Sequence, residues 1–238
     1  MENATYATLT RQSGLMSELR IIANNVANAS TTGFRAEGLL FSEYVADLGP
    51  DHPSLSLAAA RVRHTDLTQG TLTQTGGSFD LAIEGDGYFL IDTAAGPRLT
   101  RAGSFTPDTN GDLVTMDGNP VLDAGGAPVF IPQGVGPIGI AADGTISAGG
   151  DPIGQIGLVV PNDPGDMTRQ SGTMFETPGG FAPAPDGRMV QGFLEGSNVN
   201  PILEISRMIE VQRAYELGQT FLDKEDERIR NVIQSTGR

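Results

Sequence analysis

Apolar residues at helical spacing mark both ends of the chain. Near the N-terminal end they recur four, three and four residues apart, at Leu15, Leu19, Ile22 and Val26. This spacing lines one face of an α-helix, and Met16 and Ala23 widen the stripe. We expect this helix to run from about residue 4 to residue 29. Gly33 follows it and suits the left-handed conformation that closes many helices.

The C-terminal end predicts a longer helix that begins after Asn200, a suitable N-cap, with Pro201 at the first helical position. Continued to Gln234, the helix is roughly 50 Å long at about 1.5 Å per residue. Its apolar seam alternates three and four residues apart, as in a coiled coil: Met208, Val211, Tyr215, Gly218, Leu222, Glu225, Ile229 and Val232. Gly218 and Glu225 interrupt the apolar character. A second stripe opens the helix at Ile202, Ile205 and Ile209.

The end of the first helix carries Asn24, Asn25 and Asn28 within the stretch "IANNVANASTTGFRAE". Asparagine is a mediocre helix former because its amide competes for nearby backbone groups. Two interpretations remain open. The amides either cap and fray the helix end, or hydrogen-bond across the helix pair or to the departing chain and so fix its register. Capping together with a register role is favoured over any ligand role.

The middle of the chain alternates apolar and polar residues at the spacing of β-strands, as in "FDLAIEGDGYFLID". Asn-Gly or Asp-Gly precedes a short apolar stretch at residues 110–122, 143–154 and 186–192. This dipeptide is the strongest local hairpin signal. Residues 70–196 hold 26 of the 32 glycines and 12 of the 15 prolines, which places a turn-rich region between two helical ends.

These patterns predict an α+β fold. Neither terminal helix can bury its stripe alone, so we expect the two to pair as an antiparallel, coiled-coil-like core. An all-β, hairpin-rich domain is inserted between them. The expected divisions are a terminal helical domain at 1–36 and 197–238, a connector at 37–69, and a β-rich domain at 70–196. From the pattern alone, the C-terminal seam fits internal packing or a partner helix equally well.

The composition of the chain argues against several classes of binding partner and site. The net charge of −14 and the pI of about 4.4 give no general attraction to nucleic acid or to anionic membranes. The chain has no cysteine, which excludes disulfides and thiolate metal sites. We expect no membrane-spanning helix and no cleaved signal peptide, because the sequence has no long apolar run and no basic, apolar leader.

Candidate chemistry is weak throughout the sequence. "DTNGD" at 108–112 resembles a calcium loop, but the glycine and the distal glutamate are misplaced, so a hairpin turn is favoured. Glu84 and Asp86 form a carboxylate pair of the kind that glycosidases use, although acids in a turn are usually turn residues. His52 and His64 lack marker motifs and are expected in exposed loops. We therefore expect no catalytic, cofactor-binding or metal site, and we expect the acidic run at 223–227 to be solvated.

Three blocks, in order, resemble the flagellar rod and hook proteins. "IANNVANASTTGFRAE" is similar to their N-terminal signature, and "GSNVNPILEISRMIEVQRAYE" is similar to their C-terminal one. "FDLAIEGDGYFLI" with "TRAGSFTPDTNGDLVTMDGNPVL" resembles their β domain. Only residues 40–70 and 155–190 lack such a marker, so the resemblance covers most of the chain.

The resemblance implies a structural, non-enzymatic axial subunit of the flagellar basal body. Its length favours the proximal rod, the drive-shaft that transmits torque across the periplasm. The implied partners are further copies of the chain in a helical tube, other rod proteins, and the flagellar export apparatus, which exports such subunits without cleaving a signal peptide. The alternatives are a distal rod or hook subunit and, more remotely, a peptidoglycan-acting or glycan-binding protein.

The resemblance and the helical stripes together nominate residues for subunit contacts. We expect the monomer to be incompletely folded at both ends and to order as neighbouring subunits pack. The nominated residues are Leu15, Leu19, Ile22, Asn24, Asn25, Val26, Asn28, Thr31, Gly33, Phe34, Ser197, Asn198, Val199, Asn200, Met208, Ile209, Gln212, Arg213, Tyr215 and Glu216.

Overall fold

A computed structural model describes residues 2–46, 55–184 and 186–236. It confirms the α+β class, with a helix at each end of the chain and a strand-rich middle. The N-terminal helix α1 spans Glu2–Ala27 and the C-terminal helix α2 spans Pro201–Thr236, both within a few residues of the predicted bounds. Neither helix combines the length and the apolar character that crossing a membrane requires.

The chain divides into two compact units. The first, called here the terminal unit, comprises residues 1–29, 36–67 and 199–238. The second, the central unit, comprises residues 30–35 and 68–198. The chain therefore passes from one unit to the other at four places, after Ala29, Arg35, Leu67 and Asn198.

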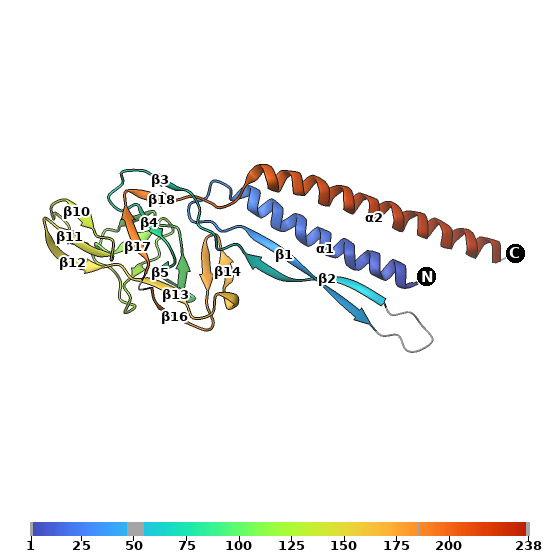
Figure 1. Cartoon of the computed structure of the whole chain (residues 1–238), viewed down its shortest axis with the longest axis horizontal. Helices are drawn as coiled ribbons and strands as arrows, with labels where there is room; N and C mark the ends of the chain where they lie inside the picture. The colour runs from blue at the N-terminus through green and yellow to red at the C-terminus, as the bar shows by residue number, and fades with distance from the viewer. Residues whose placement is uncertain (1, 47–54, 185, 237–238) are drawn as a thin grey trace. The chain divides into compact units, whose positions relative to one another are not determined.

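The terminal unit contains α1, α2 and the antiparallel pair of strands β1 (Glu37–Ala46) and β2 (Leu55–Thr65). Much of the stretch expected as a connector is thus a long hairpin. Helix α1 packs against α2 and also against both strands, so it lies between them (Figure 1). His64 lies exposed on β2, not in a loop, and His52 lies outside the described residues.

The central unit is built from short antiparallel strands. Its largest sheet has the order β14-β15-β6-β5-β13-β16, with β9 also paired to β5. A three-stranded sheet, β10-β11-β12, and the pairs β17-β4, β18-β3 and β7-β8 complete it. The bounds are β3 Leu72–Gln74, β4 Leu81–Glu84, β5 Tyr88–Thr93, β6 Gly96–Thr100, β7 Phe105–Pro107, β8 Leu113–Thr115, β9 Val121–Leu122, β10 Ile138–Ile140, β11 Thr145–Ala148, β12 Asp151–Gln155, β13 Leu158–Pro161, the 3-10 helix η1 Pro164–Asp166, β14 Thr168–Ser171, β15 Met174–Glu176, β16 Phe181–Pro183, β17 Arg188–Gln191 and β18 Phe193–Glu195.

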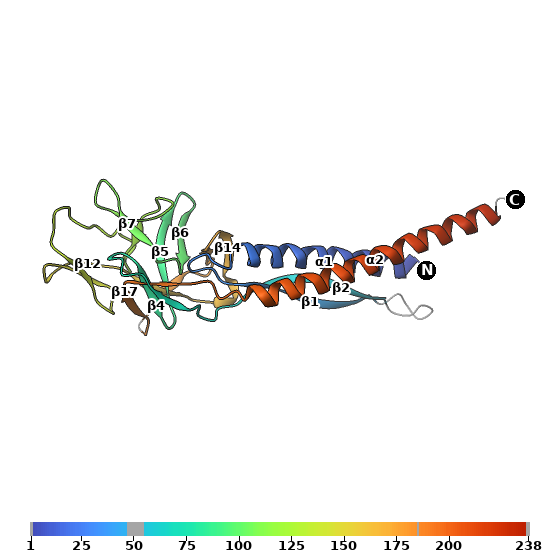
Figure 2. The same ribbon diagram turned by 90° about the horizontal axis from the view of Figure 1, so that it is seen from above.

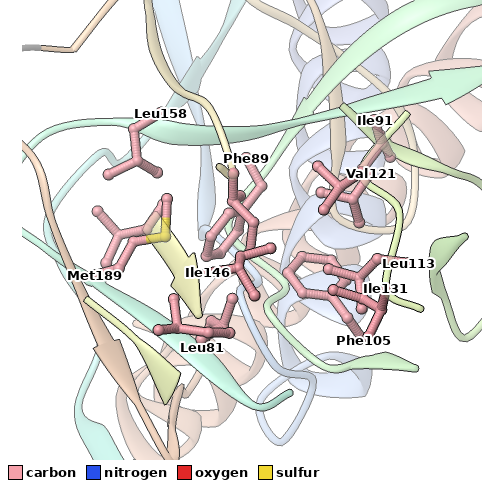
Figure 3. Packing of buried hydrophobic residues seen from close by; sticks show 14 residues of the cluster. Leu81, Phe89, Ile91, Phe105, Leu113, Val121, Ile131, Ile146, Leu158 and Met189 are labelled. Atoms are coloured by element: carbon pink, nitrogen blue, oxygen red, sulfur yellow. The ribbon is translucent and has the colours of Figure 1, made fainter. Parts of the chain in front are cut away.

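Strand β5 separates the two hydrophobic clusters of this unit. Its run Tyr88–Ile91 is buried on both faces, as expected of a continuous apolar stretch. Phe89 and Ile91 belong to one cluster, and Tyr88 and Leu90 belong to the other, because side chains alternate along a strand. In the first cluster the rings of Phe89 and Phe105 meet edge to face near Leu113, with their centroids 5.1 Å apart (Figure 3).

The Asn-Gly and Asp-Gly signals are confirmed as turns before strands. Gly111, Gly144 and Gly187 precede β8, β11 and β17. In the "DTNGD" turn the Asp108 carboxylate accepts hydrogen bonds from the backbone N–H groups of Asn110 (2.8 Å) and Asp112 (2.9 Å). Desolvation raises the pKa of Asp108, but these bonds outweigh it and hold that pKa below its usual value. The segment is thus a hairpin turn between β7 and β8, as predicted.

A buried ion centre lies in the central unit around Glu195, whose side chain is fully buried. Its Oε1 lies 2.7 Å from Nη1 of Arg35, and its Oε2 accepts a hydrogen bond from Nη1 of Arg101 at 3.2 Å. The backbone N–H of Gly70 also donates to Oε1, at 2.9 Å. Arg35 and Arg101 are themselves almost completely buried. One carboxylate therefore holds two cations away from water.

Neighbouring groups complete this centre. Arg35 also donates to the Thr68 carbonyl, and Arg101 donates to the Gly85 carbonyl at 2.8 Å. The Arg101 guanidinium lies over the Tyr88 ring, 5.0 Å from its centroid. Burial raises the pKa of the Tyr88 phenol, and the two arginines oppose that shift. The ion centre thus joins segments at residues 35, 68–70 and 195, close to three of the four places where the chain enters or leaves the central unit.

Removing the charge of Glu195 is expected to destabilise the central unit strongly. Glu195→Gln removes the charge of the carboxylate that two buried guanidinium groups share, a change that costs about 3–5 kcal/mol of unfolding free energy. Urea unfolding followed by circular dichroism measures this loss.

The matched control is Glu176→Gln, which removes a half-exposed partner 3.5 Å from Arg98. It is expected to cost less than about 1 kcal/mol. Equal losses in the two variants would show that the buried centre contributes no more than a surface ion pair.

Candidate assembly interface

The apolar residues nominated on α1 lie along the face that packs within the terminal unit, whereas the nominated Asn24 is exposed. Ile22 is buried, and Leu15, Leu19 and Val26 are half-buried. The ribbons of α1 and α2 run along each other (Figure 2), and polar side-chain contacts join the two helices. Gln12 donates to the Tyr215 carbonyl (2.9 Å), Arg207 pairs with Glu18 (2.8 Å), and Asn25 donates to Glu204 (3.3 Å). Because residue numbers rise along α1 as they fall along α2, the two helices are antiparallel.

The seam predicted on α2 is covered along only part of its length. Val211 is buried, and Met208, Tyr215, Gly218, Leu222 and Glu225 are all sheltered from solvent to an intermediate degree. Beyond Glu225 the seam continues uncovered, with Ile229 46% and Val232 54% exposed. Helix α1 spans 26 residues and α2 spans 36, so the end of α2 extends past the start of α1.

Gly218, which interrupts the seam in sequence, has a packing reason. A Cβ built on Gly218 would lie 2.3 Å from Nε2 of Gln12. Gly218 therefore gives the Gln12 amide the space to reach the Tyr215 carbonyl. Gln12 was not nominated from the sequence, although it lies seven residues before Leu19 on the same helical stripe.

Of the three asparagines, Asn24 and Asn25 lie in α1 and Asn28 directly follows it, and Asn25 makes different contacts from the other two. Asn25 is 1% exposed, and its side chain binds the backbone of Glu37 at both groups. Its Nδ2 donates to the Glu37 carbonyl (2.8 Å), and its Oδ1 accepts from the Glu37 N–H (3.0 Å). Asn28 donates instead to the carbonyl of Asn24 (2.9 Å) and to its side-chain oxygen (3.2 Å). Asn25 thus contacts the departing chain, and the other two bond locally at the helix end.

The chain that follows α1 turns at Gly33, which belongs to the central unit. Gly33 has φ +70°, and an added Cβ would lie 2.3 Å from the backbone nitrogen of Ala102. Its N–H donates to the Glu195 carbonyl at 2.7 Å. The helix ends six residues earlier, at Ala27, so Gly33 does not cap it as predicted. Gly33 instead permits a close approach between two backbones.

Phe34 is almost fully buried in the central unit. The guanidinium of Arg169 lies over the Phe34 ring at 4.4 Å and over the Phe175 ring at 4.7 Å. Arg169 also donates to the Arg35 carbonyl at 2.5 Å. Sequence reasoning missed Arg35, Arg101, Arg169 and Glu195. Arg35 and Arg101 stand inside the motif segments as charges among mostly small or apolar residues, which is a weak signal, and Arg169 and Glu195 lie outside the quoted motifs.

The C-terminal motif "SNVN" is divided between the two units. Asn198 belongs to the central unit, where its amide donates to the Thr68 carbonyl at 2.9 Å, and Ser197 and Thr31 are half-buried there. Val199 is buried in the terminal unit. The Asn200 side chain accepts from the N–H groups of Ile202 (3.2 Å) and Leu203 (3.3 Å), which confirms it as the N-cap of α2.

The remaining nominated residues, Ile209, Gln212, Arg213 and Glu216, lie exposed on α2. Glu84 and Asp86 are likewise exposed at the turn after β4. Within residues 2–46, 55–184 and 186–236, no group of three or more histidine, cysteine, aspartate or glutamate side chains is placed to hold a metal ion.

Replacing Asn25 is expected to weaken the terminal unit. Asn25→Ala removes two buried hydrogen bonds to the Glu37 backbone, and such losses cost roughly 2–3 kcal/mol of unfolding free energy. The control Asn24→Ala alters an exposed side chain and is expected to cost less than about 0.5 kcal/mol. Urea unfolding monitored by the helical circular dichroism signal compares the two. Similar losses would contradict the role given to the Asn25 amide.

Comparisons with known proteins agree with the ordered motifs. Three family models match: "Flagella basal body rod protein" at residues 7–35, "Flagellar hook protein FlgE/F/G D1 domain" at 82–148, and "Flagellar basal body rod FlgEFG protein C-terminal" at 190–235.

Similar proteins cover nearly the whole chain. The flagellar basal-body rod protein FlgF of Caulobacter vibrioides is 40% identical, over 100% of this chain and 99% of its own. The FlgF protein of Mesorhizobium japonicum is 42% identical, over 91% of this chain and 90% of its own. The rod protein FlgG of Bacillus subtilis is 30% identical, over 98% of each. This chain therefore belongs to the flagellar basal-body rod protein family.

Proposed function

We propose that the chain is an axial subunit of the proximal rod, which polymerises helically and transmits motor torque across the periplasm. Its family membership makes it a structural protein of the flagellar basal body and not an enzyme. Similarity to FlgF proteins over the full length supports the proximal position. The expected partners are further copies of the chain and other rod proteins.

The observation that carries this proposal is the contact between the two ends of the chain. Residues more than 170 positions apart bind each other at Asn25 and Glu204, at Glu18 and Arg207, and at Gln12 and Tyr215. We infer that α1 and α2 form an antiparallel, coiled-coil-like rod core from residues 1–36 and 197–238. In this scheme residues 37–69 connect the core to an outer β domain at 70–196.

Exposed apolar residues support assembly through α2. Ile202, Leu203, Ile205 and Ile209 all lie exposed in its first turns, and Ile229, Val232 and Ile233 lie exposed near its end. Exposed apolar residues that share one helix face, as Ile202, Ile205 and Ile209 do, commonly mark a protein–protein contact. A head-to-tail contact that does not close on itself produces an open helical filament. The nominated residues Ile209, Gln212, Arg213 and Glu216 belong to this exposed surface.

The same proposal includes the route to the rod. We expect export through the flagellar export apparatus without a cleaved signal peptide. We also expect the ends of the chain to be incompletely ordered until they pack against neighbours, so that the ordering cost is met on assembly. Terminal segments that are fully protected from amide exchange in the dilute monomer would contradict this expectation.

A second candidate position is the distal rod. FlgG proteins match this chain over nearly its whole length, at about 30% identity in Bacillus subtilis. Locating the chain in isolated basal bodies by labelled antibody and electron microscopy separates the two positions. Label at the proximal end supports the proposal, and label along the distal segment contradicts it.

Deleting residues 2–30 is expected to abolish incorporation into basal bodies. The deletion removes α1, so the face of α2 that α1 covers becomes exposed. Immunoblots of purified basal bodies measure incorporation, and blots of whole cells verify that the shortened chain is made. Normal incorporation would show that the helix pair is not needed for assembly.

The double substitution Asn24→Ala with Asn28→Ala is expected to leave secretion intact and to reduce assembly. The Asn28 side chain bonds to Asn24, whose own side chain is exposed, and we expect a neighbouring subunit to contact this site. The amount secreted and the amount in basal bodies are compared with the wild-type chain. Unchanged assembly would restrict both residues to capping the helix.

A further inference from the structure

We infer that a groove between α1 and α2 binds the opposite face of α2 from a second copy of the chain. This inference rests on the proposed rod function and specifies one contact within it. It concerns the terminal unit alone.

The groove has a cavity volume of about 340 Å³ and lies between the two helices. Arg11, Gln12 and Leu15 line it from α1, and Leu217, Gly218 and Phe221 line it from α2. Leu217 and Phe221 are exposed apolar side chains, and Arg11 is an exposed cation. The groove thus combines an apolar wall with one positive charge.

Gln12 adds a polar requirement to this groove. The side chain is 7% exposed, and its Nε2 donates a hydrogen bond to the Tyr215 carbonyl. Its Oε1 is buried and has no hydrogen-bond partner among the described residues. A buried acceptor without a donor costs free energy, so a donor supplied by an occupant would stabilise the complex. The occupant is therefore expected to bring a hydrogen-bond donor next to an apolar group.

The chain itself presents such a surface on α2. Ile205, Ile209, Gln212 and Glu216 recur four, three and four residues apart, so they share one face of the helix. Ile205 is 48% and Ile209 is 44% exposed, and Gln212 and Glu216 are exposed beside them. With 3.6 residues per turn, this face lies roughly 160° around α2 from the groove residues. One copy can therefore offer its groove and its opposite face at the same time.

The chemistry of the two surfaces matches group by group. Ile209 is the apolar side chain for the wall made by Leu217 and Phe221. The Gln212 amide supplies the donor that Oε1 of Gln12 lacks. Glu216 supplies the negative charge for Arg11, and such complementarity selects partners and orientation. Because groove and face differ, the contact is head-to-tail and repeats from copy to copy without closing into a dimer.

Disulfide cross-linking tests this contact in assembled basal bodies. The chain has no cysteine, so introduced cysteines report without background. The variant carrying both Ile209→Cys and Leu217→Cys is expected to give a ladder of dimers and larger species on non-reducing gels. Within one copy these residues are eight positions apart on α2, about 12 Å along the helix, which is too far for a disulfide. Each single variant is the matched control and is expected to give no cross-linked dimer.

The other outcomes overturn the inference. A dimer from either single variant would mean a symmetric contact. A cross-link to a protein of different mass would mean that another rod protein fills the groove. If the double variant is incorporated into basal bodies but gives no cross-linked ladder, the two surfaces do not meet. Absence of even the wild-type chain from basal bodies would overturn the proposed function as well, which distinguishes the two failures.

Charge reversal gives a second, independent measurement. Arg11→Glu and Glu216→Arg are each expected to lower incorporation, because each places like charges together. The two substitutions in one chain are expected to restore incorporation toward the wild-type level. A double variant no better than the single ones, with stable folding shown by circular dichroism, would overturn the pairing of Arg11 with Glu216.

Discussion

The carboxylate of Glu195 is the constraint on which the central unit depends. It lies out of water between Arg35 and Arg101 and also accepts the Gly70 N–H. Buried charge is costly unless it is paired and hydrogen-bonded, so these partners specify one arrangement of the chain. The partners come from three separate stretches of sequence. The central unit is thus completed by residues 30–35, which the chain supplies long before the strands that surround them.

The terminal unit likewise depends on a few specific polar contacts in addition to the apolar stripes of its two helices. Apolar stripes bring α1 against α2, and the pairs at Gln12, Glu18 and Asn25 set their direction and register. Helix pairs held by apolar contact alone can slide, because one heptad resembles the next. Gly218 removes this freedom locally, since only a residue without a Cβ admits the Gln12 side chain.

The sequence predicted the features that follow from periodicity. Both helices, the N-cap at Asn200 and the Asn-Gly and Asp-Gly turns depend on local spacing, and the structure has them. The ion centre was not predicted, because Arg35, Arg101 and Glu195 are far apart in sequence and none has a local signature. The strands at 37–65 were also missed as a hairpin, although Gly49-Pro50 between them is a turn signal that the sequence reasoning did not use. Strands β4 and β5 flank the predicted turn at Gly85 yet join different sheets, which is a matter of long-range pairing.

The assembly surface also could not be fully predicted, because it depends on contacts between residues far apart in the sequence. The stripes nominated exposed positions such as Ile209 and Glu216, but a stripe does not say which part a neighbouring helix covers. The burial of Gln12, by contrast, needs both helices in place, so no single-helix pattern could single out its unsatisfied oxygen.

The amide of Asn25 has a consequence for the hairpin that starts at Glu37. By exchanging two hydrogen bonds with one backbone residue, it imitates the neighbouring residue of an antiparallel strand. Strand β1 pairs with β2 along one edge, and at Glu37 the opposite edge is occupied by this side chain. An open strand edge is a template for unwanted pairing with other chains. A single helical side chain therefore protects the hairpin at its base from accepting a foreign strand.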